Sequence, residues 1–298
     1  MTDRNAAELY LLFMVLVWAL NFSVIKYSLA EIDPLSFNAI RFSLGIMLMW
    51  VVVGFRKLKI RIERKDFGKM ILLGILGTLL YQMLFIVGIN RTNASNAAVM
   101  LGMIPIWIAL LTHLFTDEKM YRTQAIGVIT AFLGVALIMG GGEEGLTLQS
   151  QTLLGDLIIV SAALVFAVYT LISRSMLAIY SSLTLATVVM TVGGVMLIIV
   201  AIPSLIRLDF HAISLITYGG AAYSGFFAIG IALLVWNFGI KSVGTVRTST
   251  WQNMVPVFGV LFGLIFLGEK LHFLQYLGCL LTIGGIILSR TKSKQILS

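Results

Sequence analysis

Charged residues are scarce in this chain, and their scarcity excludes most classes of soluble protein. Asp, Glu, Lys and Arg make up 11% of the 298 residues, whereas hydrophobic residues make up 59%. A soluble domain carries roughly 25% charged residues, because it must cover a large surface with polar groups. Apolar runs of about 20 residues without alternation also exclude an outer-membrane barrel. Composition therefore leaves a polytopic helical membrane protein.

Cysteine is nearly absent, and so are the usual motifs of enzymes. The single Cys279 cannot form a disulfide within the chain, and no Cys/His cluster could hold a metal. The chain lacks a phosphate-binding Gly-rich loop ending in Lys-Ser/Thr, an H-E-x-x-H motif and a G-x-S-x-G motif. We therefore predict no metal, no cofactor, no catalytic residue set and no direct use of ATP.

Ten apolar stretches are long enough to span about 30 Å of hydrocarbon. Acidic residues precede the first stretch, and its apolar run is long, so we expect an uncleaved span rather than a signal peptide. The connections are short, which predicts an all-α membrane protein without an attached soluble domain. The predicted spans are 9–29, 35–55, 69–89, 94–116, 122–140, 153–175, 182–203, 215–240, 244–267 and 272–290.

Lys and Arg are distributed unevenly between the predicted loops. Sixteen of the 21 fall on the side of the two termini, and Arg41 lies inside the second span. The other side has Lys26, Arg91, Arg207 and Lys270. Positive charge is enriched in cytoplasmic loops, so we expect both termini in the cytoplasm and the chain in the cytoplasmic (inner) membrane of a prokaryote. No basic stripe with aromatics stands apart from these loops, so we expect no nucleic-acid partner.

The sequence contains an internal repeat. Residues 18–48 align with 166–196 at an offset of 148, and from residue 74 onward the offset is 151. The matched residues include Gly74 with Gly225, Met103 with Met254, Pro105 with Pro256 and Gln124 with Gln275. The repeat predicts two halves, residues 1–145 and 146–298. Each half has five spans, so the second enters the membrane inverted, an architecture typical of secondary transporters with a substrate site near the midplane.

Several short motifs resemble one known family. Trp18-Ala19-Leu20-Asn21-Phe22 with Lys26 opens the first span, and Gly268-Glu269 is followed by Gln275, Gly278 and Gly285. The first half has Asp117-Glu118, Gln124, Gly127 and Gly134 at the matching positions. Together with the repeat, these motifs resemble the EamA-type branch of the drug/metabolite transporter superfamily. The resemblance implies ten helices around a central cavity and transport of small metabolites, amino acids or drugs, often as export.

Two functional classes compete at this point. The first is a secondary transporter that exports a small metabolite such as an amino acid, or a drug-like compound, across the cytoplasmic membrane by alternating access. The second is a membrane-embedded lipid-modifying enzyme, or a membrane sensor or assembly factor that transports nothing. No Asp or Glu lies deep in a predicted span, which predicts weak or no carboxylate-based proton coupling. The absence of a convergent acid, base and nucleophile favours the transporter.

Polar and aromatic residues in spans one, three and six are candidate substrate contacts. They are Asn21, Phe22, Tyr81 and Tyr169. An Asn near the midplane would be costly if it faced lipid, so Asn21 should face the interior, and Tyr169 takes its place in the second half. The alternative is that these side chains only pack between helices.

Span nine is unusually polar before its proline. Trp251, Gln252 and Asn253 are candidate substrate contacts, or else they form hydrogen bonds between helices. Pro105 and Pro256 occupy matching positions in spans four and nine. Proline lacks an N–H and kinks a helix, so both predict hinges in a cavity wall, or packing kinks without a ligand.

Three further features have structural alternatives. Arg41 lies inside a span and could contact substrate. It could instead reach the membrane interface or pair with Glu31 or Asp33, and the sequence favours these alternatives over substrate contact. The pairs Glu118-Lys119 and Glu269-Lys270 should tie loops or cap helices. Small residues form stripes that let helices approach closely, within the chain or in a possible homodimer. The stripes are Gly127/Ala131/Gly134 and Gly278/Thr282/Gly285.

Overall fold

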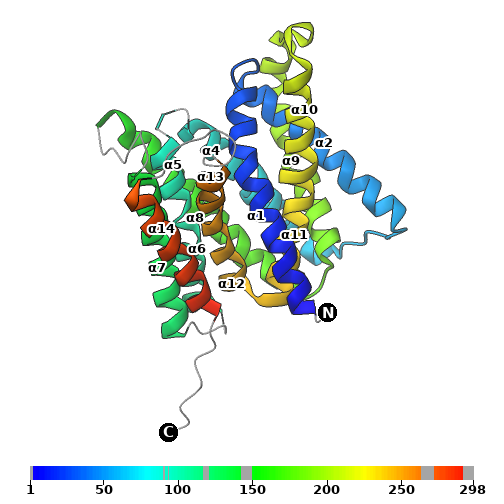
Figure 1. Cartoon of the computed structure of the whole chain (residues 1–298). Coiled ribbons are helices and arrows are strands. Elements are labelled where there is room, and N and C mark those ends of the chain that lie inside the picture. The colour runs from blue at the N-terminus through cyan, green and yellow to red at the C-terminus, as the bar shows by residue number, and fades with distance from the viewer. Residues whose placement is uncertain are drawn as a thin grey trace. The chain divides into compact units, whose positions relative to one another are not determined.

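Helices make up the ordered secondary structure of the protein (Figure 1). The computed structural model describes residues 3–89, 91–92, 94–116, 121–141, 150–262 and 272–290. Within these ranges there is no β-strand. The hydrocarbon core of a membrane offers no water to backbone N–H and C=O groups, and a helix pairs these groups within its own segment. The predicted all-α class is confirmed for this part of the chain.

Six of the described helices are long and uninterrupted. They are α1 Asp3–Ser28, α2 Pro34–Phe55, α7 Arg122–Gly140, α8 Ser150–Leu177, α9 Ser182–Arg207 and α14 Phe273–Arg290. Other apolar stretches are divided into shorter pieces. These are α3 Phe67–Gly74, η2 Ile75–Leu80 and α4 Tyr81–Ile89; α5 Ala94–Leu101 and α6 Ile104–Phe115; α10 Leu215–Tyr223, η4 Ser224–Ile231 and α11 Ala232–Val243; and α12 Thr245–Thr250, η5 Trp251–Asn253 and α13 Met254–Phe262. Short 3₁₀ turns, η1 Arg64–Asp66 and η3 Phe210–Ala212, lie in loops.

Seven helices of the described residues are long and apolar enough to cross a membrane. They comprise Asn5–Ile25, Pro34–Phe55, Arg64–Ile89, Arg122–Gly140, Leu153–Leu177, Ser182–Arg207 and Leu215–Val243. Shorter apolar helices cover Val99–Phe115 and Phe273–Ser289, within the predicted spans 94–116 and 272–290. The predicted span 244–267 extends beyond the described residues. The layout with ten spans therefore stays a prediction.

The chain forms two compact units, each made from both halves of the sequence. Unit 1 comprises Met1–Ile86 and Ile172–Ser242, and unit 2 comprises Val87–Leu171 and Val243–Ser298. The predicted halves, residues 1–145 and 146–298, follow the sequence repeat rather than these units, and they stay a prediction.

Glycines bring helices of unit 1 into close contact. Gly225 in η4 packs against α2, where an added Cβ would lie 2.5 Å from the carbonyl oxygen of Arg41. A Cβ on Gly45 would in turn lie 3.1 Å from the carbonyl oxygen of Gly225. A second close contact joins α9 and α3: a Cβ added to Gly193 would lie 2.9 Å from the carbonyl carbon of Gly74. Backbone contacts this short require residues without side chains.

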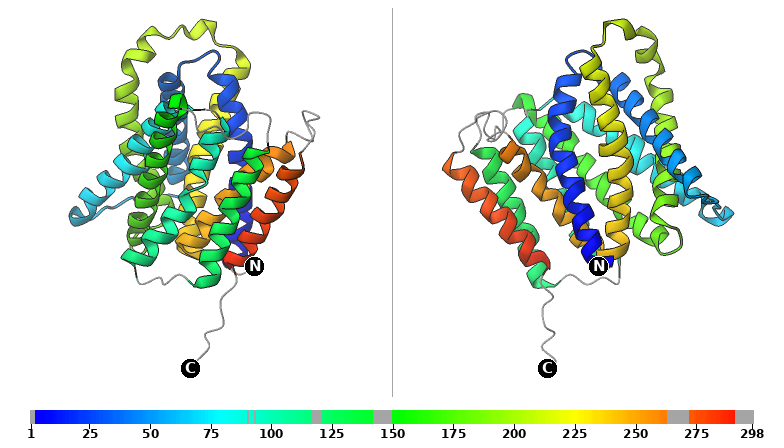
Figure 2. Two further views of the ribbon diagram at one scale, coloured as in Figure 1. Left: turned by 90° about the vertical axis from the view of Figure 1, so that its left-hand side faces the viewer. Right: turned by 45° about the vertical axis from the view of Figure 1, so that its right-hand side comes forward.

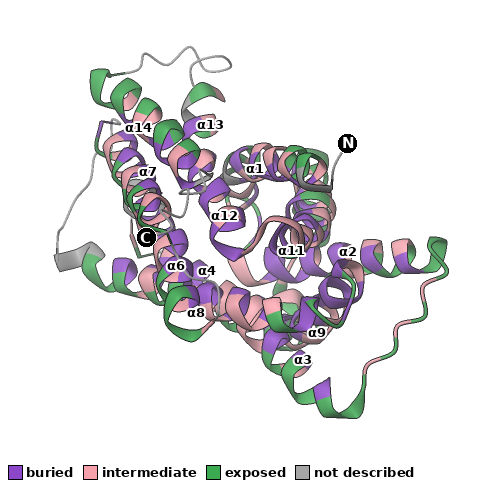
Figure 3. Cartoon of the chain, turned by 90° about the horizontal axis from the view of Figure 1, so that it is seen from below, coloured by how far each residue is buried: buried purple, intermediate pink, exposed green. Residues whose placement is uncertain are grey.

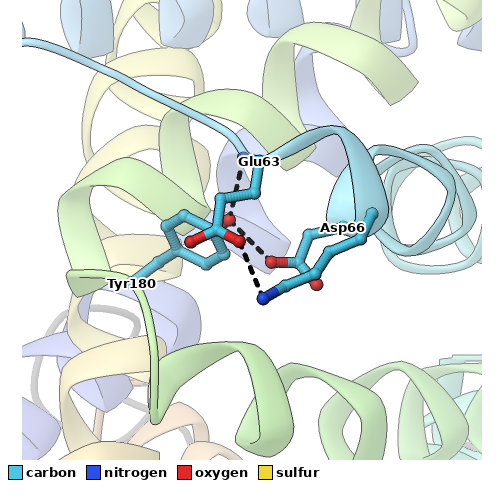
Figure 4. Close-up of polar contacts among 4 residues, drawn as sticks. Glu63, Asp66 and Tyr180 are labelled. Carbon is cyan, nitrogen blue, oxygen red and sulfur yellow. Dashed lines mark hydrogen bonds and ion pairs between the residues drawn. The ribbon is translucent and has the colours of Figure 1, made fainter.

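One end of unit 1 is held by Tyr180, in the loop between α8 and α9 (Figure 4). Its hydroxyl donates to Oδ2 of Asp66 at 2.8 Å and accepts from the backbone N–H of Glu63 at 3.1 Å. The N–H of Glu63 lowers the pKa of the Tyr180 hydroxyl, but burial and the neighbouring carboxylates of Asp66 and Glu63 raise this pKa on balance. The Lys65 ammonium pairs with Glu63 at 2.7 Å on the exposed side. Two loops that are far apart in the sequence are therefore tied together.

Asp33 caps the N-terminus of α2. Its Oδ1 accepts the backbone N–H groups of Leu35 and Ser36, each at 3.1 Å, and Pro34 occupies the first helical position. Burial raises the pKa of the Asp33 carboxyl, but the hydrogen bonds from Ser36, Ser204 and Leu35 outweigh burial and leave this pKa below its usual range. An acidic N-cap satisfies donors that have no partner in the first turn.

In unit 2, α7 and α14 lie side by side, as both views of Figure 2 show. Both helices carry buried residues at intervals (Figure 3), and these include Gly127, Ala131 and Gly134 of α7 and Gly278, Thr282 and Gly285 of α14. A Cβ added to Gly285 would lie 2.6 Å from the carbonyl oxygen of Gly127, and one added to Gly278 would lie 2.6 Å from that of Gly134. The predicted small-residue stripes thus pack against each other within the chain, and the predicted homodimer stays a prediction.

Candidate substrate site

Asn21 lies on α1 in unit 1, and its side chain is 8% exposed. Its Oδ1 is buried without a hydrogen-bond partner. One turn earlier, Trp18 donates its indole N–H to the backbone carbonyl of Ala228 in η4, at 2.9 Å. The structure therefore packs this face of α1 inside unit 1 and leaves an unused acceptor on it. Phe22 also belongs to α1, but its side chain lies outside the described part of the structure.

Tyr81 begins α4, directly after the π-helical segment η2. Its ring stacks on Phe85, with 6.2 Å between the ring centroids, and the residue is partly exposed. The next residue, Gln82, accepts a hydrogen bond from Arg41. The first turn of α4 therefore carries two polar side chains next to a buried charge.

Arg41 lies next to these candidates, and sequence reasoning considered it as a substrate contact without favouring that role. The expectation that it reaches the interface or pairs with Glu31 or Asp33 is wrong, because its side chain is 3% exposed and donates to Gln82 and Ser224. A charge inside an apolar span is the sequence signal that marks such a residue as a functional candidate. The sequence could not show that Ser224 lies beside it, since the two residues are 183 positions apart.

Asn38, one turn before Arg41 on α2, is a residue that the sequence analysis missed. It is 0% exposed, and neither atom of its side-chain amide has a hydrogen-bond partner. Buried side-chain amides normally have a hydrogen-bond partner. An unpaired buried amide therefore indicates a functional role or a partner that is absent from the structure. The sequence signal was an Asn inside an apolar span.

Two π-helical segments lie within unit 1. They are η2, Ile75–Leu80, and η4, Ser224–Ile231. π-Helical turns are rare and occur frequently at functional sites. Such turns also redirect backbone carbonyls, and in η4 the carbonyl of Ala228 accepts the Trp18 indole from α1. No sequence pattern predicted these segments.

Trp251, Gln252 and Asn253 lie together in unit 2, in the 3₁₀ turn η5 between α12 and α13. Asn253 is 1% exposed, and both atoms of its amide lack a hydrogen-bond partner. The Oε1 of Gln252 is also buried without one. Trp251 is 8% exposed. Three adjacent candidates therefore form one polar turn, in which Trp251 and Asn253 are buried and two amides have unused hydrogen-bonding capacity.

Tyr169 also belongs to unit 2, where it lies in α8 and is fully buried. Its ring packs on Phe166, with 5.5 Å between the centroids. The substrate role predicted for this residue, and for the other candidates, stays a prediction.

Helix interruptions lie next to both predicted hinge prolines in unit 2. α5 ends at Leu101, and Pro105 occupies the first turn of α6. Pro256 lies in the first turn of α13, after the 3₁₀ turn η5. Proline favours the first turn of a helix, because its missing N–H is not needed there. The hinge role of both prolines stays a prediction, and the pairs Glu118-Lys119 and Glu269-Lys270 lie outside the described residues.

Known proteins resemble this chain over most of its length. YyaM of Bacillus subtilis (strain 168), named an uncharacterized transporter, is 30% identical over 267 residues, 89% of this chain and 87% of YyaM. An uncharacterized transporter of Archaeoglobus fulgidus is 28% identical over 272 residues, 91% of this chain and 94% of that protein. A solved crystal structure shares the fold with a TM-score of 0.82, over 96% of this chain and 97% of its own, at 16% identity.

The EamA-like transporter family matches the sequence twice, over residues 5–140 and 153–291. The two matches cover most of the chain, and they agree with the motifs from which the resemblance was predicted. Helices that are long and apolar enough to cross a membrane accompany them. The chain is therefore an integral membrane protein and belongs to the EamA-like transporter family.

Proposed function

We propose that this protein is a secondary transporter that moves a small metabolite, such as an amino acid, or a drug-like compound across the cytoplasmic membrane by alternating access. The observation that carries the proposal is the double match to a transporter family, over residues 5–140 and 153–291. Two related halves can exchange conformations at little energetic difference, so one substrate site could open to either side in turn.

Helix interruptions at matched positions support this proposal. At the offset of 151 residues, the π-helical segment Ile75–Leu80 corresponds to positions within Ser224–Ile231. At the same offset, the break after Leu101 corresponds to the 3₁₀ turn Trp251–Asn253. Discontinuous helices at corresponding places in two halves are typical of transporter substrate sites.

Reciprocal glycine contacts in unit 1 support the two-fold relation of the halves. Gly45 of the first half packs on Gly225 of the second, and Gly193 of the second half packs on Gly74 of the first. The repeat aligns Gly45 with Gly193 and Gly74 with Gly225. The two contacts are therefore images of each other under exchange of the halves, as a two-fold axis requires.

The proposal includes ten spans, with the halves inverted and both termini in the cytoplasm. Single cysteines in a Cys279→Ser background test this topology. Lys59→Cys should react with a membrane-impermeant maleimide only after the cells are permeabilised. His211→Cys should react in intact cells, since both positions are exposed and the proposal places them on opposite sides. Labelling of both from the same side would contradict the inverted arrangement.

Transport itself is tested with purified protein in liposomes. Labelled amino acids and other metabolites are supplied with and without a pH gradient. Liposomes with the protein inserted inside-out are measured separately from those with right-side-out protein, so that the direction of transport can be assigned. Ala variants of Asn21, Tyr81, Tyr169 and Gln252 should slow transport without unfolding the protein. Normal rates in all four would remove these side chains from the site, and chemical alteration of a lipid without transport would favour the enzyme alternative.

A further inference from the structure

A guanidinium group is buried in unit 1 with most of its hydrogen-bonding capacity unused. Arg41 lies about two turns into α2, and its side chain is 3% exposed. One terminal nitrogen donates to Oε1 of Gln82 at 2.9 Å, and the other donates to Oγ of Ser224 at 3.2 Å. Nε has no partner. A guanidinium has five N–H donors, so these two bonds leave the majority of them available.

The positive charge of Arg41 has no acidic partner in the described part of the chain. No carboxylate oxygen there lies within 4.0 Å of the guanidinium. Acidic side chains of unit 1 are used elsewhere: Glu31 accepts a backbone N–H at 2.8 Å, Asp33 caps α2, and Asp66 accepts a tyrosine hydroxyl at 2.8 Å. The charge therefore remains uncompensated among these groups.

Packing alone explains this burial poorly. The rings of Phe37 and Phe42 lie 5.6 and 5.9 Å from the guanidinium carbon, which provides weak cation–π attraction. Two bonds to neutral groups add further partial stabilisation. A charged side chain inside a membrane is costly, and it normally pairs with an opposite charge. A negatively charged ligand would supply that partner and would use the free donors.

The neighbours of Arg41 lie in or next to π-helical segments. Ser224 begins the π-helical segment η4, and Gln82 follows directly after the π-helical segment η2. Asn38 lies one turn before Arg41 on the same face of α2, is 0% exposed, and has no partner for either amide atom. An unused cation and an unused amide thus lie one helical turn apart, next to two irregular segments.

We propose that Arg41 binds a carboxylate group of the transported solute, with Gln82 and Ser224 orienting the guanidinium and Asn38 binding a neighbouring polar group. The inference rests on the proposed transport function and narrows its substrates to small solutes that carry a carboxylate. Arginine suits this role because its planar fork matches the two oxygens of a carboxylate.

The experiment compares solutes that differ only in charge. Protein in liposomes is given a panel of labelled amino acids and other small carboxylic acids, the neutral amide of each acid, and a set of amines and uncharged drug-like compounds. Wild-type protein should transport one or more of the acids and should transport their amides at least tenfold more slowly. Arg41→Gln should lower the rate for the acids at least tenfold. Arg61→Gln, which removes the same charge from an exposed loop, should retain the wild-type rate.

A second variant keeps the test decisive if Arg41→Gln fails to fold. Gln82→Glu is isosteric and places a carboxylate where an amide oxygen now accepts from Arg41 at 2.9 Å. This internal partner should preserve or raise the thermal midpoint and should lower transport of the acids at least tenfold, because it competes with the solute. If Arg41 only packs, the variant would transport the acids like wild type, which overturns the inference.

The remaining outcomes separate the inference from the proposed function. Transport restricted to amides, amines or uncharged compounds would overturn the carboxylate site and leave the transporter standing. Transport of acids that is unchanged in folded Arg41→Gln would do the same. A wild-type protein that transports no member of any charge class would overturn both proposals together.

Discussion

Two adjacent glycines of α14 provide a matched test of the close packing in unit 2. A Cβ added to Gly285 would lie 2.6 Å from the carbonyl oxygen of Gly127 and 2.9 Å from Cα of Ala131, whereas a Cβ on Gly284 would meet nothing within 4 Å. Ordinary contacts begin at 3.4 Å, so Gly285→Ala must separate α7 from α14 by at least about 0.8 Å, since every close atom is backbone. Gly284→Ala changes the neighbouring position of the same helix and requires no such movement.

The expected difference between the two variants is large. Overpacking of this kind costs about 1–3 kcal/mol. Gly284→Ala should instead stabilise the helix by about 0.5–1 kcal/mol, because glycine loses more backbone entropy than alanine. The two variants should therefore differ by about 1.5–4 kcal/mol in stability, which corresponds to a difference of at least about 3 °C in Tm.

The single cysteine of the chain provides the measurement. Cys279 lies in α14 and is half-buried, so a maleimide that becomes fluorescent on reaction reports the loss of this helix pair. Heating both variants in the same detergent at one scan rate gives comparable midpoints, even where unfolding is irreversible. A midpoint for Gly285→Ala equal to or above that of Gly284→Ala would refute the described packing of α7 against α14.

Other contacts give further expectations for the same thermal assay. Asp33→Ala should cost about 1 kcal/mol of stability at neutral pH through loss of the N-cap. Because the pKa of the Asp33 carboxyl lies below its usual range, the stability that the carboxylate contributes should be present above about pH 4 and be lost as pH falls through that lowered pKa. Asp33→Asn should keep the cap without this acid sensitivity. Trp18→Phe should destabilise by about 1–2 kcal/mol, since the buried carbonyl of Ala228 loses its donor; an unchanged midpoint would exclude this bond. Tyr180→Phe should lower the thermal midpoint at neutral pH through loss of the hydrogen bond to Asp66. Because the pKa of Tyr180 is raised, the stability that its hydroxyl contributes should be complete below about pH 10 and be lost at higher pH. If the variant loses stability at alkaline pH in the same way as wild type, this assignment is contradicted.

Much of the class and family could be read from the sequence, because both depend on properties of short segments. Long apolar runs and scarce charge predicted membrane helices, and the described helices confirm this class. The motifs around Asn21 and Gln275 predicted the family, which the double match confirms. The prolines at 105 and 256 predicted irregular helices, and interruptions lie beside both.

The environment of Arg41 shows where sequence reasoning stopped. The sequence marked the residue as costly, yet it favoured the interface or a local acid as its partner. The structure surrounds it with Gln82 and Ser224, which are 41 and 183 positions away. The π-helical geometry at Ser224 was also invisible, since no local residue pattern in the sequence marked it.

Segment hydropathy, the internal repeat and the family motifs were determined by the sequence alone, because each is a property of residues that are close in the chain or matched by a fixed offset. Tertiary structure decided which of the scarce polar groups lost their solvent and which found partners. Arg41 and Asn38 became buried when helices from both halves packed around them, and among the described residues no carboxylate pairs with the Arg41 guanidinium. The free energy of a buried charge depends on its neighbours in space, and a one-dimensional pattern does not contain those neighbours.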